Sequence, residues 1–277
     1  MLMKLGRKLP TSLKTKLKKI FNRKFRRSIA MSYYEEKLAL IDKWICLDKE
    51  TSNFYYRLTP LNRDQLAQMI ATVTGAEYNV IIQYFDELEG DTELRRHLED
   101  ALRGTKYGTE INIDYARRLG WYAFIRVLKP RVVVETGVDH GVGSCVLASA
   151  LLRNIAEGHA GQYYGTEIRK EAGQLFSGKY ASVGKILYDD SITSLKKLEE
   201  KIDLFVNDSD HSGEYEYQEY VTIVDKLADK GIILGDNAHV TDSLSRFSKE
   251  KNRKYLFFCE KPEDHWYPGA GIGVSFK

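Results

Sequence analysis

Two short apolar runs of this 277-residue chain end in acidic, amide and imidazole side chains, within DLFVNDSDHSGEY and GIILGDNAH. The polar residues of the two clusters are Asp208, Asp210, His211, Asp236, Asn237 and His239. If the two runs are neighbouring parallel strands, their carboxyl ends meet at one crevice of the sheet. Carboxylates gathered there repel one another unless a cation neutralises them. Because Asp and Asn oxygens suit a hard cation, the clusters predict a divalent metal site, with magnesium as the expected ion.

The two histidines of these clusters, His211 and His239, are candidate general bases. A free imidazole has a pKa near ~6.5, which suits proton abstraction at neutral pH. In a second interpretation, Asp210 and His211 only cap the helix that follows. A later loop, PEDHWYPGAG, contains His265, Trp266 and Tyr267. These rings either close over a substrate or pack as a surface corner.

A glycine-rich turn follows another apolar run, in VVVETGVDHGVGSCVLASALL. Its glycines, Gly137, Gly141 and Gly143, allow the backbone to approach a ligand, and a helix beginning near Ser144 points N–H groups at the same place. A dinucleotide fingerprint would need a third glycine where Val146 stands. Glu135, just before the glycines, would repel a pyrophosphate but can pair with a cationic amino acid. The turn therefore favours S-adenosylmethionine over NAD.

Further carboxylates follow the next two apolar runs. Glu167 ends YYGTEI, where a carboxylate can accept hydrogen bonds from the ribose hydroxyls of an adenosine. Asp189 and Asp190 end the following run, where one of them can meet an adenine amino group. The pattern leaves open which of the two faces inward, and the other is expected to be a solvated turn residue.

From Arg131 onward, apolar segments alternate with helical ones. The expected strands are 132–135, 162–167, 185–188, 204–208 and 231–235. Such alternation is typical of a parallel sheet covered by helices on both faces. Two last strands, 254–259 and 272–276, are joined by a loop too short for a helical crossover, which predicts an antiparallel hairpin.

The region before this alternation reads as helical. Thr59 and Pro60 signal the start of a helix that ends at Gly75, and helices are also expected at 78–88, 92–102 and 114–128. We expect three parts: an arm at 1–32, a helical cap at 33–113 and a cofactor-binding domain at 114–277. The cap contains no catalytic motif.

The glycine turn and the acidic strand ends together resemble the class I S-adenosylmethionine-dependent methyltransferases over residues 115–277. The resemblance implies an α/β fold, a Rossmann-like three-layer sandwich with a seven-stranded, mostly parallel sheet and an antiparallel last strand. It also implies direct in-line methyl transfer. In this resemblance the cofactor-binding residues are Glu135, Gly137, Gly141, Gly143, Ser144, Glu167, Asp189, Asp190 and Asp210.

The clusters after the fourth and fifth strands resemble those of metal-dependent O-methyltransferases that act on catechols and caffeoyl-coenzyme A. By position, Asp208, Asp236 and Asn237 would bind the metal, and Asp210 would approach the methionine end of the cofactor. The stretch DSDHSGEYEYQEY is closer to a bacterial branch assigned to natural-product or sugar substrates. The chain departs from the catechol enzymes in its long cap and in His211, where they often carry Lys.

Charge separates the arm from the rest of the chain. Residues 1–32 contain eleven Lys and Arg and no Asp or Glu, whereas the remainder contains 31 basic and 39 acidic residues. Leu13, Leu17, Ile20 and Phe21 recur at helical spacing among the lysines, which predicts a basic amphipathic helix that lies on an anionic membrane. The alternative is a solvated tail. The acidic remainder argues against nucleic acid as a partner.

Three widely spaced cysteines without a CxxC pair indicate a reducing compartment, so we expect a cytoplasmic protein, peripheral to a membrane if the arm binds one. The favoured function is O-methylation of a small-molecule or glycan hydroxyl. Two alternatives are an NAD- or nucleotide-sugar-dependent enzyme and a membrane-associated protein with a degenerate pocket. The sequence leaves the acceptor and the oligomeric state open.

Overall fold

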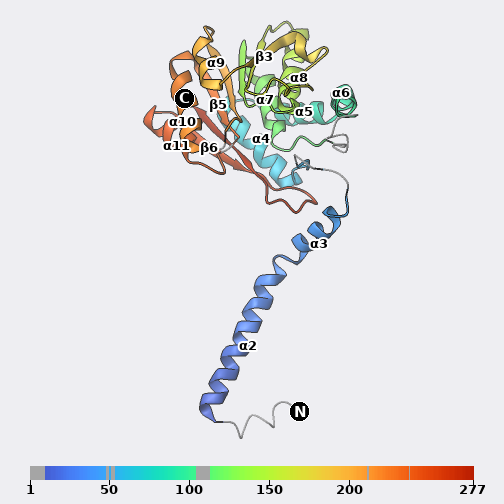
Figure 1. The fold of residues 1–277 in the computed structure, drawn as a ribbon, viewed down its shortest axis with the longest axis vertical. Coiled ribbons are helices and arrows are strands. Elements are labelled where there is room, and N and C mark those ends of the chain that lie inside the picture. Colours follow the sequence, from blue (N-terminus) through green and yellow to red (C-terminus); the bar gives the residue numbers. More distant parts are fainter. Residues whose placement is uncertain (1–9, 48–49, 51–53, 104–112, 211, 237) are drawn as a thin grey trace. The chain divides into compact units, whose positions relative to one another are not determined.

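The computed structural model of the chain describes residues 10–47, 50, 54–103, 113–210, 212–236 and 238–277. The chain divides into two compact units (Figure 1). The first comprises Met1–Asp48 with Asp264–Trp266, and the second comprises Lys49–Glu263 with Tyr267–Lys277.

The first unit is built on two helices, α2 (Thr11–Ser32) and α3 (Glu35–Trp44). The predicted amphipathic helix is therefore present. The segment Asp264–Trp266 is held to α3, because the Lys37 ammonium donates to the His265 carbonyl at 2.9 Å and the rings of Trp44 and Trp266 meet edge to face at 5.2 Å. None of the described helices has the length and apolar character needed to span a bilayer.

The second unit contains a seven-stranded sheet with the strand order β3-β2-β1-β4-β5-β7-β6. The strands are β1 (Val132–Thr136), β2 (Gln162–Glu167), β3 (Gly184–Tyr188), β4 (Ile202–Asn207), β5 (Leu227–Gly235), β6 (Lys254–Cys259) and β7 (Gly271–Phe276). The first five strands pair in parallel, whereas β7 runs antiparallel to both β5 and β6. The predicted α/β fold, with its antiparallel hairpin at the C-terminal end, is thus confirmed.

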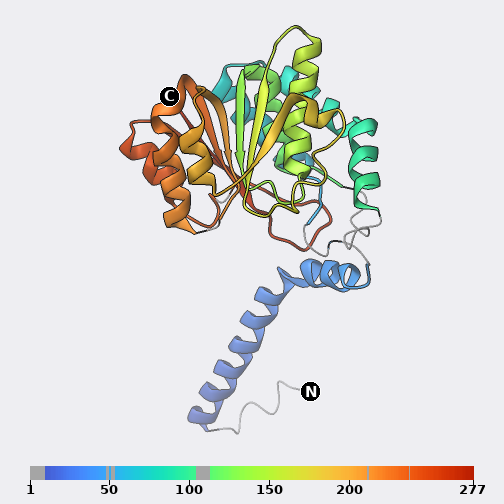
Figure 2. The same cartoon turned by 45° about the horizontal axis from the view of Figure 1, so that its top comes forward.

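Helices cover both faces of this sheet (Figure 2). On one face lie α7 (Arg118–Leu128) and α8 (Val142–Ala156), with α4 (Pro60–Thr74), α5 (Tyr78–Glu89) and α6 (Thr92–Leu102) packed onto them. The other face carries α9 (Ser191–Lys197), α10 (Gly213–Ile223) and α11 (Ser243–Glu250). Two short 3-10 helices, η1 (Tyr180–Val183) and η2 (Val224–Lys226), precede β3 and β5. Each face of the sheet therefore has its own apolar core.

The helix signals in the sequence act as predicted at α4, whereas α7 ends as predicted but begins four residues later. Thr59 accepts a hydrogen bond from the Asn62 amide at 3.3 Å, and Gly75 ends α4 at a φ of 74°. The helix expected from residue 114 begins only at Arg118, because Ala116 adopts a φ of 47°, which interrupts a right-handed helix. This late start leaves Arg117 at the first turn of α7.

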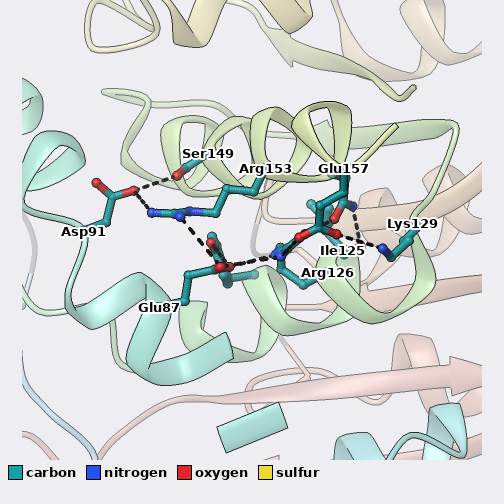
Figure 3. A network of polar contacts seen from close by, with 10 residues as sticks. Glu87, Asp91, Ile125, Arg126, Lys129, Ser149, Arg153 and Glu157 are labelled. Atoms are coloured by element: carbon teal, nitrogen blue, oxygen red, sulfur yellow. Dashed lines mark hydrogen bonds and ion pairs between the residues drawn. The ribbon is translucent and has the colours of Figure 1, made fainter. Parts of the chain in front are cut away.

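A network of ion pairs ties the predicted cap to the sheet-covering helices (Figure 3). Arg126 of α7 contacts Glu87 of α5 at 2.7 Å and Glu157, just after α8, at 2.5 Å. Arg153 of α8 reaches Asp91, at the start of α6, at 3.2 Å. Since Arg126 is almost fully buried, these contacts fix the packing of α5 against α7 and α8.

Candidate active site

A cavity of about 690 Å³ lies at the carboxyl ends of the five parallel strands. The loops after β1 to β5 all contribute to its wall, together with the start of α7 and the segment before α4. This is the crevice where open parallel sheets bind their ligands. Its volume is in the range of about 300–1,000 Å³ that is typical of small-molecule sites.

The glycine turn between β1 and α8 leaves no room for side chains. Gly137 has a φ of 82°, and a Cβ on it would overlap the carbonyl oxygen of Asp208. Gly141 caps α8 at a φ of 100°. A Cβ on Gly143 would overlap the carboxylate of Glu135. The turn therefore brings bare backbone to the cavity wall, as a ligand-binding turn requires.

Glu135, in β1, is the buried carboxylate beside this turn. Its Oε2 accepts hydrogen bonds from Ser144, at 2.6 Å, and from the hydroxyl of Tyr163. Burial raises the pKa of Glu135 to about 7, although these hydrogen bonds and the nearby Arg118 oppose the rise. A cationic ligand would favour the ionised carboxylate. Ser144, predicted as a cofactor contact, is fully buried and acts here by positioning Glu135.

Glu167, at the end of β2, also lines the cavity. Its Oε2 accepts from the Asp139 amide at 2.9 Å, and its Oε1 accepts from the Arg169 amide at 2.9 Å and from the Arg169 side chain. Burial favours the neutral acid, but these donors outweigh it and lower the pKa of Glu167. The carboxylate is therefore ionised and held in place.

The structure separates the two aspartates that follow β3. Asp190 lines the cavity, where it caps α9 through the Thr193 amide at 2.9 Å and accepts from the Tyr215 hydroxyl at 2.5 Å. Asp189 is exposed and pairs with Lys197 at 2.9 Å, away from the cavity. Asp190 is thus the inward residue that the sequence left unresolved.

Beyond β4 and β5, Asp208 and Asp236 converge as predicted, but Arg117 joins them. The Arg117 guanidinium pairs with both carboxylate oxygens of Asp236, one of them at 2.5 Å. Burial alone would raise the pKa of Asp236, and Arg117 instead lowers it. Burial and the charge of Asp236 raise the pKa of Asp208 well above its usual range, so an ionised Asp208 is disfavoured beside Asp236.

Arg117 has a second buried partner, Glu260, at the end of β6. The Arg117 amide donates to Glu260 Oε1 at 2.7 Å, and its Nη1 lies 3.4 Å from Oε2. Glu260 also accepts from the Tyr56 hydroxyl at 2.8 Å and the Ala270 amide at 3.0 Å. Burial would lower the pKa of Arg117, but Asp236 and Glu260 raise it. The guanidinium is therefore a permanent cation fixed between two strand ends.

In this arrangement the predicted metal ligand Asp236 is paired with Arg117, and the metal site itself stays a prediction. Both oxygens of Asp236 are paired with Arg117, and the pKa of the neighbouring Asp208 is raised. Asn237, the third predicted ligand, lies outside the described residues. Within the described ranges, no three His, Cys, Asp or Glu side chains converge in a way that could hold a metal ion. Arg117 supplies the positive charge that the sequence argument assigned to magnesium.

The remaining predicted residues divide between the cavity and other places. His239 lines the cavity, and its Nδ1 lies 3.1 Å from the carbonyl oxygen of Asp236. Asp210 also lines it, but accepts from the Ser212 amide at 3.2 Å in the turn before α10. His211 lies outside the described residues. From the aromatic loop, Tyr267 lines the cavity, whereas His265 and Trp266 pack with the first unit.

Two polar groups that sequence reasoning missed face the same cavity. Arg118 lies over the ring of Trp121 at 5.6 Å, and its Nε is buried without a hydrogen-bond partner among the described residues. The same holds for the hydroxyl of Thr166, in β2. Buried polar atoms in proteins almost always have partners, so these two atoms are candidates for ligand contacts. The stretch YARRLGW offers no spacing that could have identified Arg117 or Arg118.

Comparison with known proteins finds similarity to methyltransferases. Residues 134–238 match a family model described as a methyltransferase domain. The O-methyltransferase TomG of Streptomyces achromogenes, solved with S-adenosylmethionine, has 13% sequence identity and a TM-score of 0.50, over 67% of this chain and 90% of its own. A protein of Klebsiella pneumoniae, assigned as an O-methyltransferase, has 16% identity and a TM-score of 0.49, over 68% and 90%. No curated protein sequence matches the chain significantly. At such identities the TomG structure shows the fold alone.

Proposed function

We propose that this chain, which has the class I methyltransferase fold and a methyltransferase domain at residues 134–238, methylates a hydroxyl group of a small molecule or glycan with S-adenosylmethionine. The main support is that three carboxylates line one cavity beside the glycine turn, at the ends of β1, β2 and β3. They are Glu135, Glu167 and Asp190.

The part of the cavity beside β1, β2 and β3, which we call the cofactor half, supports this assignment through its charged side chains. A methionine end carries one ammonium and one carboxylate, and Glu135 and Arg118 offer one partner for each. The ionised Glu167 suits ribose hydroxyls, and Asp190 suits an adenine amino group. S-adenosylmethionine would supply the electrophilic methyl group. The residues bind and orient it, and such orientation of two reactants contributes much of the acceleration in enzymes.

The part of the cavity beside β4 and β5, which we call the acceptor half, supports methyl transfer to oxygen without a divalent cation. Arg117 takes the place in which a metal would neutralise Asp236, and it cannot lose its charge at working pH. His239 is the base that we assign. Because the Asp236 carbonyl can only accept, Nδ1 of His239 carries the hydrogen and Nε2 is left as the basic nitrogen.

Calorimetric titration tests the cofactor assignment. We expect S-adenosylhomocysteine to bind the wild-type chain and NAD to give no heat. Replacing Glu167 by Ala should weaken S-adenosylhomocysteine by ~1–3 kcal/mol, the value of a charge-assisted hydrogen bond. Binding of NAD instead would support the oxidoreductase alternative, and binding of neither would support a degenerate pocket. Transfer of a labelled methyl group to a panel of hydroxylated acceptors would then identify the substrate class.

A further inference from the structure

The helix α2 is unusual in that none of its 22 residues is buried. It contains eight Lys and Arg and no Asp or Glu. An isolated helix of this length, with charges of one sign, is only marginally stable in water. Helices in proteins are stabilised mainly by packing of an apolar face against another surface. The apolar face of α2 is therefore expected to have a partner that covers it.

Five of the exposed apolar side chains of α2 form one continuous ridge, which turns about 40° around the helix at each four-residue step. Leu13, Leu17, Phe21, Phe25 and Ile29 follow one another at four-residue spacing, and 41–68% of each is exposed. Residues four apart lie one above the other on a helix. The rings of Phe21 and Phe25 accordingly stack, with their centroids 6.4 Å apart.

Most basic residues lie on the opposite side of the helix. At about 100° per residue, the side away from the ridge carries Lys16, Lys19, Arg23, Arg26 and Arg27. The other three, Lys14, Lys18 and Lys24, flank the ridge, where long aliphatic stems let an ammonium reach water while the helix lies on an apolar surface.

This combination selects one kind of partner. A nucleic acid would pair with the basic side but leave the aromatic ridge in water. A second copy of α2 could cover the ridge but would bring eight more positive charges close to these eight. An anionic lipid surface satisfies both features, because acyl chains receive the ridge while lipid headgroups attract the basic residues.

We propose that α2 lies in the plane of an anionic membrane, with the ridge from Leu13 to Ile29 inserted below the headgroups. This site is independent of the proposed methyl transfer, since no residue of α2 lines the active-site cavity. It would hold the chain at a membrane surface through a helix that lies in the plane of the bilayer.

Vesicle flotation with the full-length chain tests the proposal. One set of vesicles contains phosphatidylcholine alone, and the other contains equal parts of phosphatidylcholine and phosphatidylglycerol. We expect binding to the mixed vesicles that weakens as salt is added, and at least about tenfold less binding to the neutral ones.

Two variants separate the ridge from the charges. Phe21→Ser with Phe25→Ser should weaken binding to the mixed vesicles about tenfold or more, because apolar insertion is lost. Lys19→Gln, Arg23→Gln and Arg26→Gln together should weaken it about 100-fold at low salt. The matched control is Tyr33→Ser with Tyr34→Ser, which removes two exposed aromatics outside the ridge and should leave binding unchanged.

Three outcomes would overturn the proposal. Failure of the wild-type chain to float with mixed vesicles at low salt excludes the membrane. An unchanged affinity of the Phe21/Phe25 variant excludes in-plane insertion and leaves only charge attraction. Concentration-dependent self-association that is abolished by the same variant, with no vesicle binding, would assign the ridge to a second copy of the chain.

Discussion

The two halves of the cavity treat their carboxylates differently. On the side of β1, β2 and β3, the carboxylates lie apart from one another. Glu135 is held by the hydroxyls of Ser144 and Tyr163, whereas Glu167 is held by two backbone amides and by the half-exposed side chain of Arg169. On the side of β4 and β5, two carboxyls lie against each other, and a guanidinium from the start of α7 neutralises them. The buried Glu135 of the first half has no cation paired with it among the described residues, whereas the buried Asp236 of the second half is already paired with the mostly buried Arg117.

The largest expected effect comes from removing that cation. Arg117→Met should destabilise the chain by about 3–5 kcal/mol, because the buried carboxylates of Asp236 and Glu260 lose the cation that is paired with them. Chemical unfolding followed by tryptophan fluorescence measures it. The control is Arg118→Met, since Arg118 forms no ion pair within the described part of the chain. Equal losses in both variants would contradict the assigned role of Arg117.

A second test addresses the point where the two halves meet. Gly137→Ala forces a Cβ against the backbone of Asp208 at a positive φ, so we expect a loss of about 2–3 kcal/mol in stability and weaker binding of S-adenosylhomocysteine. Gly158 has a similar φ of 88° with open space around it, so Gly158→Ala should lose only about 1 kcal/mol and keep full affinity. Similar effects at both glycines would show that the close approach is unimportant.

The cofactor half should respond to pH through Glu135. Its pKa of about 7 means that the free protein holds a proton there that an ammonium ligand must displace. The affinity for S-adenosylhomocysteine should therefore rise with pH, by up to roughly tenfold per unit below pH 7, and level off above it. The raised pKa also means that an ionised Glu135 is unfavourable in the ligand-free protein. The contribution of Glu135 to the free energy of unfolding therefore falls as the pH rises toward 7. Glu135→Gln should abolish the pH dependence of binding.

The smallest effect concerns the aspartates after β3. Asp190→Asn should weaken S-adenosylhomocysteine a few-fold, by less than about 1.4 kcal/mol, because the amide oxygen can still accept one hydrogen bond. Asp189→Asn should change nothing, since Asp189 points to Lys197. Calorimetry on the pair measures the difference. An equal loss in both would mean that neither residue meets the ligand directly.

The difference between the two halves of the cavity also explains how much of the structure could be predicted from the sequence. Apolar runs predicted β1, β2 and β3 to within one residue at each end and indicated the carboxylates Glu135 and Glu167. They predicted the start of β4 two residues late and the start of β5 four residues late, because the first residues of β5 are not an apolar run. The sequence left open whether Asp189 or Asp190 faces the cavity, because this depends on which of them caps α9. The direction of a side chain at the end of a strand does not follow from the residue types around it. Arg117 was missed because its partners lie 119 and 143 residues away along the chain. The sequence showed the carboxylates of the predicted metal site but not the guanidinium that lies beside Asp236 at the start of α7. The metal site itself stays a prediction.

Manganese binding tests the central claim, that an arginine occupies the place of a metal, most directly and without knowledge of the acceptor. Mn²⁺ is titrated into the chain with saturating S-adenosylhomocysteine, and free Mn²⁺ is measured by electron paramagnetic resonance. We expect no stoichiometric binding by the wild-type chain, and a gain of binding in Arg117→Ala, where the carboxylates of Asp236 and Glu260 are released. One Mn²⁺ bound tightly per wild-type chain, and lost in Asp236→Asn, would contradict the account and restore the metal-dependent mechanism.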